Sequence, residues 1–239
     1  MNYYTSFFKR TFDLVFAVIC FLLFIPSLAV LIGVKIVNGG QNIFFVQPRV
    51  GYKNKIFLIY KFATMVEGSH KTQSAFITTA HDYRITSIGA ILRKTKIDEL
   101  PQIINIFRNE MSVVGPRPLM KESFYSYPRE IQNIIYNTKP GITGIGSLIF
   151  RDEERLMTIC KEKGMDPLDY YKNHIYAFKG DLETWYLQNV GFKTDIKILI
   201  LTFWVVFSRD NNLVQKAFSN LPKVPLLLTE DGLREHKLN

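Results

Sequence analysis

The longest uninterrupted hydrophobic run extends from Leu14 to Ile36 and carries no charged residue before Lys35. A bilayer crossing needs about 20 apolar residues, so the run is long enough to span one. Pro26 and Ser27 lie near its middle, and a proline there removes a backbone hydrogen bond and bends the helix. Basic residues flank both ends of the run, so the positive-inside tendency gives it no clear orientation.

These two features predict a re-entrant helix, kinked at Pro26 and Ser27, that enters and leaves the bilayer on the cytoplasmic face. A proline-kinked full span and a secretory signal are the alternatives. The signal is the weaker one, because signal apolar runs extend over only about 7–15 residues and a clear cleavage site follows them.

Shorter patterns follow along the chain. Residues 43–46 and 56–60 have the composition of strands, separated by a break at 47–51, and residues 38–41 and 67–83 are polar and read as a turn and a loop. Helical spacing is found at 84–94 and 98–109, at 119–137 with an interruption near Pro128, and from 151 to about 178 in two helices. Residues 195–207 form an apolar helix, short for a span, that we expect to be buried or to lie on the membrane surface with Trp204 at the interface.

We therefore expect an α+β fold, mostly helical with a few short strands. A re-entrant membrane helix over residues 1–40 would precede a membrane-associated catalytic domain over 41–210 and a loose tail over 211–239. Amphipathic helices on the membrane surface would complete the attachment.

Composition narrows the classes of partner. The 239 residues carry a net charge of +9, which favours an anionic partner such as a nucleic acid, a nucleotide or an acidic leaflet. The two cysteines provide no disulfide framework, and the four histidines share no metal-ligand spacing. No nucleic-acid-binding module is recognisable.

The most chemically informative stretch begins at Arg93 and contains the adjacent carboxylates Asp98 and Glu99, followed by Pro101. Proline is tolerated in the first turn of a helix, and Asp is a good N-cap, so we place the two acids at a helix N-terminus. The helix dipole and the basic residues upstream should keep Asp98 ionised. A helix cap, a metal ligand and a nucleophile toward phosphorus all remain open for it.

Gly115, Pro116, Arg117 and Pro118 form a rigid turn. The two prolines restrict the backbone on both sides of Arg117, which suits bidentate contact with a phosphate. Lys61, at the end of an apolar run, reads from its spacing as a solvated strand end. The glycine-rich stretch 139–146 is weak evidence for a loop that approaches a phosphate.

Taken together, the motifs resemble the bacterial sugar transferases known as monotopic phosphoglycosyl transferases. The matching pieces run in the family's order over residues 7–146: Lys9-Arg10 with Asp13, Pro26, Phe45 with Gln47-Pro48-Arg49-Val50-Gly51, Tyr60-Lys61-Phe62, Thr64-Met65, Arg93, Asp98-Glu99-Leu100-Pro101-Gln102, Asn105, Met111-Ser112, Gly115 to Pro118, and Lys139 to Gly144.

The resemblance implies transfer of a sugar phosphate from a UDP-sugar to a polyprenyl phosphate such as undecaprenyl phosphate, with release of UMP. It implies that Asp98 is the nucleophile, that Glu99 acts as a base or supports a Mg²⁺ ion together with Asp98, and that Lys61, Arg93 and Arg117, with Gly115 and Pro116, contact the phosphates. It further implies a monotopic protein of the bacterial inner membrane, facing the cytoplasm, that initiates an exopolysaccharide, a capsule or an O-antigen. A homo-oligomer is left open.

The chain departs from the family's pattern at three places: Ile25 stands where Ser often precedes the central proline, Ala63 replaces a basic residue, and residues 146–154 replace a polar Gly-Arg-Asn stretch. The last departure leaves the sugar undetermined. Two further functions remain as alternatives, a membrane-attached, metal-dependent phosphohydrolase of nucleotide sugars and a non-catalytic scaffold or nucleic-acid binder.

Overall fold

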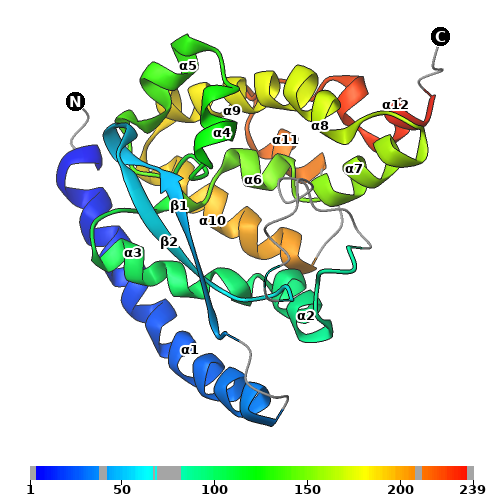
Figure 1. Cartoon of the computed structure of the whole chain (residues 1–239). Coiled ribbons are helices and arrows are strands. Elements are labelled where there is room, and N and C mark those ends of the chain that lie inside the picture. Colours follow the sequence, from blue (N-terminus) through cyan, green and yellow to red (C-terminus); the bar gives the residue numbers. More distant parts are fainter. Residues whose placement is uncertain (1–3, 38–41, 67, 69–81, 208–211, 236–239) are drawn as a thin grey trace.

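A computed structural model describes residues 4–37, 42–66, 68, 82–207 and 212–235 of the chain. The fold is mostly helical with a few short strands, as the sequence predicts (Figure 1). The predicted turn 38–41 lies outside the described residues, as does most of the predicted loop 67–83.

Four strands and twelve α-helices make up most of the described chain. The strands are β1 (Phe44–Val50), β2 (Ile56–Phe62), β3 (Ser112–Val114) and β4 (Gly141–Thr143). The helices are α1 (Lys9–Val37), α2 (Ser87–Thr95), α3 (Ile103–Phe107), α4 (Lys121–Tyr125), α5 (Arg129–Ile134), α6 (Ile145–Ile149), α7 (Glu153–Glu162), α8 (Pro167–Tyr170), α9 (Tyr176–Asn189), α10 (Phe192–Phe207), α11 (Asn212–Ala217) and α12 (Glu230–Glu235).

Helix α1 contains the long apolar run and runs along one side of the molecule (Figure 1). Pro26 lies inside it, and the Ser27 hydroxyl donates a hydrogen bond of 2.8 Å to the carbonyl of Phe24. Among the described residues, this is the one helix long and apolar enough to cross a membrane. Several of its large apolar side chains are exposed, including Val15, Val18, Ile19, Leu22, Ile25 and Val30.

Strands β1 and β2 form an antiparallel hairpin in which Val50 pairs with Ile56 and Phe44 with Phe62. The sequence-based expectation ended the first strand at Val46, and the structure shows that this was wrong. The strand continues through Gln47, Pro48 and Arg49 to Val50. Proline is tolerated in such a position because β1 has a hydrogen-bonded partner on one side only, so one edge of the strand needs no donor.

The segment read as a glycine-rich loop contains strand β4, which pairs in parallel with β3. The glycines here allow backbones to approach closely. A Cβ on Gly141 would lie 2.1 Å from the backbone nitrogen of Gly115, and a Cβ on Gly144 would lie 2.2 Å from the Gly115 carbonyl oxygen. The 139–146 segment therefore packs directly against the Gly115–Pro118 turn and holds it in place.

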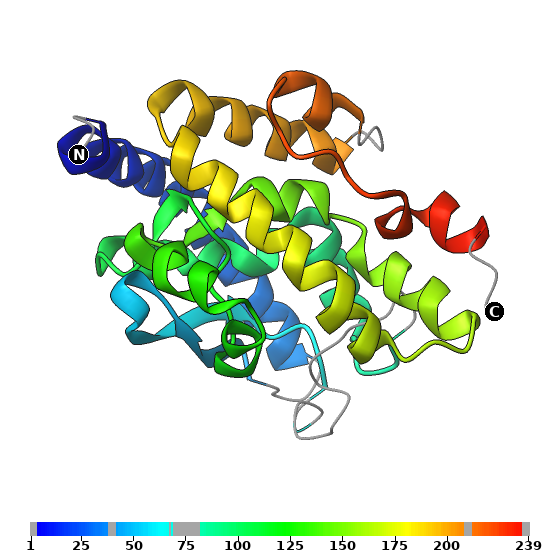
Figure 2. The ribbon, with the colours of Figure 1, turned by 90° about the horizontal axis from the view of Figure 1, so that it is seen from above.

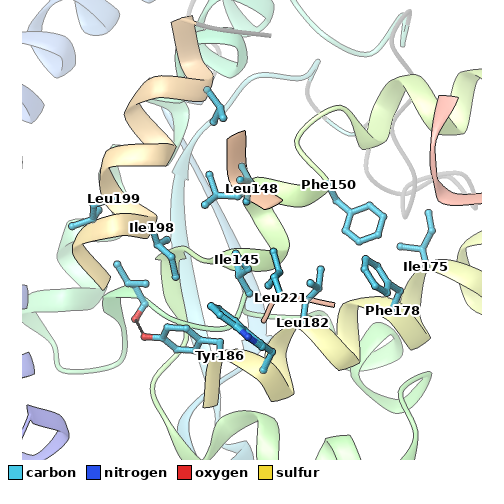
Figure 3. Close-up of a cluster of buried hydrophobic side chains, with 14 of the residues drawn as sticks. Ile145, Leu148, Phe150, Ile175, Phe178, Leu182, Tyr186, Ile198, Leu199 and Leu221 are labelled. Atoms are coloured by element: carbon cyan, nitrogen blue, oxygen red, sulfur yellow. Dashed lines mark hydrogen bonds between the residues drawn. The ribbon is translucent and has the colours of Figure 1, made fainter. Parts of the chain in front are cut away.

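Helices α6, α9 and α10 surround a hydrophobic cluster that includes Ile145, Leu148, Leu182, Ile198 and Leu199 (Figure 3). Figure 2 shows α9 and α10 as neighbouring helices over this part of the molecule. The outer side of α10 carries Ile200, Phe203 and Trp204, all more than half exposed. The prediction of a helix over 195–207 is confirmed, and its start lies three residues earlier.

The C-terminal segment is folded, which corrects the expectation of a loose tail. Helix α11 contributes Val214 to the main core and helix α12 contributes Leu233. Leu221 and Leu228, in the stretch of chain that joins the two helices, are buried in the same core. The hydroxyl of Tyr170 donates to the carbonyl of Leu227, and Arg155 forms an ion pair of 3.0 Å with Glu230. Leu213, Val214, Ala217, Phe218 and Leu221 recur at helical spacing, so the sequence held a signal for this packing that the expectation of a loose tail did not use.

A buried polar cluster joins the start of α1 to the rest of the protein. The Lys9 ammonium group lies 2.5 Å from the Asp195 carboxylate at the start of α10 and also donates to the carbonyl of Val114 at 2.9 Å. Tyr4 and Tyr186 both donate hydrogen bonds to Asp195. Four residues further along α1, Asp13 accepts hydrogen bonds from the hydroxyl of Ser112 and the backbone N–H of Val113. Both ends of β3 are thus bound to the first turns of α1.

The ion pair between Lys9 and Asp195 predicts a large loss of stability in Asp195→Asn. Asp195 is fully buried and the Lys9 side chain is 7% exposed, so the substitution leaves a buried ammonium group without its counter-charge. Removing one partner of such a pair costs about 3–5 kcal/mol. Thermal unfolding in detergent should show a clear fall in Tm, whereas Lys193→Met, which removes an exposed lysine of the same helix, should change it little. Equal effects of the two substitutions would contradict the role assigned to the pair.

Candidate active site

Asp98 and Glu99 lie in the first turn of a 3₁₀ helix, Ile97–Gln102, that leads directly into α3. Lys96, in a left-handed conformation with φ of 59°, occupies the N-cap position between α2 and this helix. The predicted helix start is therefore confirmed, but the prediction of Asp98 as the N-cap is wrong. A left-handed residue at Lys96 turns the chain sharply, and both acids follow it.

Glu99 lies between two cations. The ammonium group of Lys61 donates to its carboxylate at 2.8 Å, and the guanidinium of Arg117 lies 3.6 Å from the same oxygen. Burial opposes the charge on Glu99, but Lys61 and Arg117 outweigh it and hold the pKa of Glu99 well below its usual range. Glu99 is therefore ionised at neutral pH and a poor proton acceptor.

Asp98 has the opposite environment. Its side chain is buried, and Oδ1 has no hydrogen-bond partner in the part of the chain that the structure describes. Burial and the neighbouring negative charge of Glu99 raise the pKa of Asp98, while Lys61, Lys96 and Arg93 partly offset them. The expectation that the helix dipole and the basic neighbours keep Asp98 ionised stays a prediction, and burial and the adjacent carboxylate act against these cations by raising the pKa of Asp98.

Lys61 lies inside β2 and is largely buried, so reading it as a solvated strand end was wrong. Burial lowers the pKa of Lys61, and the charge of Glu99 works against that shift. The β-hairpin places Lys61 against the 3₁₀ helix that carries the two acids. Spacing could not show this, because the contact joins residues 38 positions apart in the sequence.

Arg117 projects from a turn that is braced on its backbone. The hydroxyl of Tyr136 donates to the Arg117 carbonyl at 2.8 Å and accepts from the Leu119 backbone N–H at 2.8 Å. The Pro116 carbonyl accepts a hydrogen bond of 2.9 Å from Gly141, and Gly115 donates to Thr143 at 2.9 Å. The Arg117 side chain remains 45% exposed, so its backbone is held while its guanidinium can meet a ligand.

Arg93 reaches the same cavity from α2. Its Nε donates to the Thr64 hydroxyl at 3.0 Å, and its Nη1 donates to Glu154 at 3.0 Å. The structure thus brings Lys61, Arg93, Asp98, Glu99 and Arg117 to one cavity, although they come from four separate segments.

That cavity has a volume of about 1580 Å³. Asp98 and Glu99, which we call the dyad, form a polar part of its wall together with the cations Lys61, Arg93 and Arg117. Phe16, Cys20 and Ser27 of α1 line it as well, together with apolar side chains such as Phe44 and Phe62. A charged region and an apolar region bounded by the long helix therefore belong to one continuous space.

The dyad also fits a Mg²⁺ site with only two protein ligands. Within the described residues, no group of three or more His, Cys, Asp and Glu side chains is arranged to hold a metal ion. Mg²⁺ is commonly held by one or two carboxylates together with substrate phosphates and water, so the unpartnered oxygen of Asp98 and the carboxylate of Glu99 suit it.

Four further charged residues line this cavity, of which sequence reasoning named Arg49 within a motif and Glu153 within the stretch 146–154, but neither Lys179 nor Glu183. Arg49 belongs to a motif of the hairpin, and burial together with the nearby Arg117 lowers its pKa to about 10. Glu153, Lys179 and Glu183 line another part of the wall. No sequence signal marked Lys179 or Glu183, because only the packing of α9 brings them to the cavity.

The model of the bacterial sugar transferase family matches residues 4–209, which include every element that lines this cavity. The chain belongs to the bacterial sugar transferase family. The resemblance noted in the sequence is thereby confirmed.

Relatives of the chain agree with this assignment. A UDP-galactose-lipid carrier transferase of Erwinia amylovora is 33% identical over 86% of this chain and 42% of its own length. An undecaprenyl-phosphate galactose phosphotransferase of Salmonella typhimurium is 30% identical over 86% of this chain and 42% of its own length. The chain thus spans less than half of these two sugar transferases. An uncharacterised sugar transferase of Bacillus subtilis is 35% identical over 81% of this chain and 84% of its own length.

The brace on Arg117 predicts the behaviour of Tyr136→Phe. The substitution keeps the ring but leaves the Arg117 carbonyl and the Leu119 N–H without their partner. Leaving buried polar groups unpaired costs about 1–3 kcal/mol. Chemical or thermal unfolding should show a loss of this size. Tyr125→Phe, which removes a hydroxyl from an exposed tyrosine, provides the matched control; a Tyr136→Phe protein as stable as that control would show that the brace contributes nothing.

Proposed function

We propose that this sugar transferase moves a sugar-1-phosphate from a UDP-sugar to a polyprenyl phosphate such as undecaprenyl phosphate, at the cytoplasmic surface of the bacterial inner membrane. The observation that carries the proposal is the pair of unequal carboxylates. Asp98 lines the cavity with one oxygen that has no hydrogen-bond partner among the described residues, while Glu99 is held by Lys61 and Arg117.

In the first step, a carboxylate oxygen of Asp98 attacks the phosphorus that bears the sugar. The bond from that phosphorus to the bridging oxygen breaks, UMP leaves with the electron pair, and a phosphosugar remains on Asp98. In the second step, an oxygen of the lipid phosphate attacks the same phosphorus. The acyl-phosphate bond breaks, Asp98 is restored, and the product is a polyprenyl-diphosphate-linked sugar.

The surrounding residues suit this chemistry because phosphoryl transfer depends mainly on positioning and on neutralising the phosphate oxygens. Arg117 and Arg93 reach the cavity with guanidinium groups that fit phosphate oxygens, and Lys61 adds a third positive charge. The depressed pKa of Glu99 argues against its action as a base. We assign Glu99 to holding Lys61 and Arg117 in place and, with Asp98, to holding Mg²⁺, which when bound would neutralise diphosphate charge.

The position of the cavity suits two substrates of different solubility. Its wall includes residues of α1, whose outer apolar side chains we assign to the bilayer, with the helix re-entrant at Pro26. The exposed apolar residues of α10, among them Trp204, would lie on the membrane surface. A lipid phosphate could then reach Asp98 along α1 while the nucleotide sugar arrives from the cytoplasm. A two-step mechanism allows the two to use the site in turn.

The deciding experiment incubates the detergent-solubilised protein with Mg²⁺ and a panel of UDP-sugars, without lipid. We expect a single-turnover burst of UMP and a mass adduct of one sugar phosphate on Asp98, both absent in Asp98→Asn. Asp181→Asn, an exposed aspartate outside the cavity, is the control. Addition of undecaprenyl phosphate should then yield the lipid-linked sugar.

Other outcomes of that experiment separate the alternatives. Lipid-linked product without an adduct would leave the transfer intact and remove the covalent step. Steady release of free sugar phosphate into water, independent of lipid, would favour a phosphohydrolase. Failure to use any nucleotide sugar, with or without lipid, would refute the proposed transfer.

The loss of activity at low pH should report the protonation of Asp98. A protonated Asp98 cannot attack phosphorus, so activity is lost as pH falls through its pKa. Because burial and Glu99 raise that pKa, the loss should begin above the ordinary aspartate range near pH 3.9. Lys61→Met removes a charge that lowers the pKa of Asp98, so the acid limb should move to higher pH.

The same substitution should also reduce kcat by about 10²–10³, the usual effect of losing one preorganised stabilising group. Lys55→Met, at an exposed lysine near the turn of the hairpin, controls for the change in net charge. An acid limb that stays in place in Lys61→Met would show that Asp98 is not the group that titrates.

A further inference from the structure

A second polar wall faces the cavity beside the catalytic dyad. Lys179 of α9 forms an ion pair with Glu153 at the start of α7 and donates to the hydroxyl of Tyr171 at 2.5 Å. The Lys179 ammonium lies 5.0 Å from the ring centre of Phe150 and 4.8 Å from that of Tyr171. We call Glu153, Tyr171, Lys179 and Glu183 the α9 wall; all four line the cavity.

Glu183 is the member of this wall with unused hydrogen-bonding capacity. It lies one turn after Lys179 on α9 and is only 4% exposed, and its Oε2 has no hydrogen-bond partner among the described residues. The nearby backbone N–H of Arg117 favours the charged form of its carboxyl group and partly offsets burial. A buried polar atom without a partner is costly, so an oxygen of this kind that lines a cavity indicates a ligand that completes it.

The chain leaves room for this carboxyl group at the neighbouring helix. A Cβ on Gly146 of α6 would lie 2.8 Å from Oε1 of Glu183, so a side chain there would push the carboxyl group away. Burial raises the pKa of Glu183 to about 8. At neutral pH the group is therefore mostly a neutral carboxylic acid that can donate a hydrogen bond as well as accept one.

The α9 wall therefore has little net charge. Lys179 and Glu153 neutralise one another, Glu183 is mostly protonated, and Tyr171 adds a hydroxyl and an aromatic ring. A set of neutral donors and acceptors beside aromatic rings suits an uncharged polyhydroxylated ring. It does not suit a second phosphate, which would need a free cation, nor a carboxylate, which would lie near the carboxylate of Glu153.

Arg117 connects this wall to the dyad. Its guanidinium lies 3.6 Å from Glu99, and Arg117 is also among the groups that act on the carboxyl group of Glu183. A diphosphate held by the guanidinium would therefore have the α9 wall next to it. The part of a nucleotide sugar attached to the phosphorus under attack is the sugar ring.

We infer that the α9 wall is the subsite for the donor's sugar ring and selects a neutral hexose or N-acetylhexosamine over a hexuronic acid. The inference rests on the proposed transfer and adds the class of sugar and the residues that select it. Glu183 and Lys179 are the specificity-determining residues, and Gly146 makes space for Glu183.

The test measures KM and kcat for UDP-glucose, UDP-galactose, UDP-N-acetylglucosamine, UDP-N-acetylgalactosamine and UDP-glucuronic acid, together with the inhibition constant of UMP. The wild type should use one or more neutral sugars and discriminate against UDP-glucuronic acid. Glu183→Gln and Lys179→Met should each raise KM for the preferred sugar about tenfold, the effect of losing about 1.4 kcal/mol of binding. They should reduce the preference among sugars and leave UMP inhibition unchanged, because UMP carries no sugar of this kind.

Matched controls lie on the same helical stretch. Asp181→Asn and Lys172→Met alter exposed residues outside the cavity and should leave every constant as in the wild type. Tyr171→Phe removes one hydroxyl and keeps the ring, so it tests the wall even if Glu183→Gln or Lys179→Met fails to fold in a thermal scan. It too should raise KM for the preferred sugar without affecting UMP inhibition.

Three results would overturn the inference while leaving the transfer in place. The first is a loss of UMP inhibition equal to the rise in KM, which would assign the wall to the nucleotide. The second is a set of folded variants with unchanged KM and unchanged sugar preference. The third is a wild type that uses UDP-glucuronic acid as well as the neutral sugars. A wild type that processes no UDP-sugar would instead remove the proposed function, and this inference with it.

Discussion

The buried ion pair between Lys9 and Asp195 is the interaction on which the arrangement of this protein most depends. An apolar helix has no intrinsic preference for one position against a folded domain, because its surface is similar all along. Lys9 removes that freedom by meeting Asp195 and the carbonyl of Val114, while Asp13 bonds the other end of β3. Because Val114 directly precedes the turn that carries Arg117, one polar cluster positions both the long helix and this turn.

The two adjacent carboxylates acquire different properties because their neighbours differ. Glu99 has cations on its carboxylate and is held ionised, whereas Asp98 lies buried beside that charge with one oxygen unpartnered. An ionised Glu99 keeps Lys61 and Arg117 in place but raises the pKa of Asp98. Asp98 is thus left available to a ligand, while Glu99 is occupied with its two cations. Such a division suits a nucleophile supported by a fixed anion.

Several elements show where local sequence rules succeed and where they fail. Pro128 interrupts a helical segment as expected, because a proline in a helix interior has a local effect. Strand β1 runs past its predicted end and through Pro48, because β2 pairs with it along one edge and no donor is needed from Pro48 on the other. The C-terminal segment folds because Val214, Leu228 and Leu233 find places in a core built by distant residues. Contacts at long range decided both of the latter cases.

By itself, the sequence determined the family, the long apolar helix with its central proline and the helical character of most segments. Through the resemblance it also pointed to five residues that the structure brings to one cavity, namely Lys61, Arg93, Asp98, Glu99 and Arg117. The order of motifs and the spacing of apolar residues are properties of the sequence alone, so both can be recognised without the structure. Only the tertiary structure decided that Lys61 meets Glu99, that Asp98 is buried with a raised pKa, and that Glu153, Lys179 and Glu183 share the same cavity. Charge, burial and partner choice depend on residues far apart in the chain, and no local pattern records which of them come together.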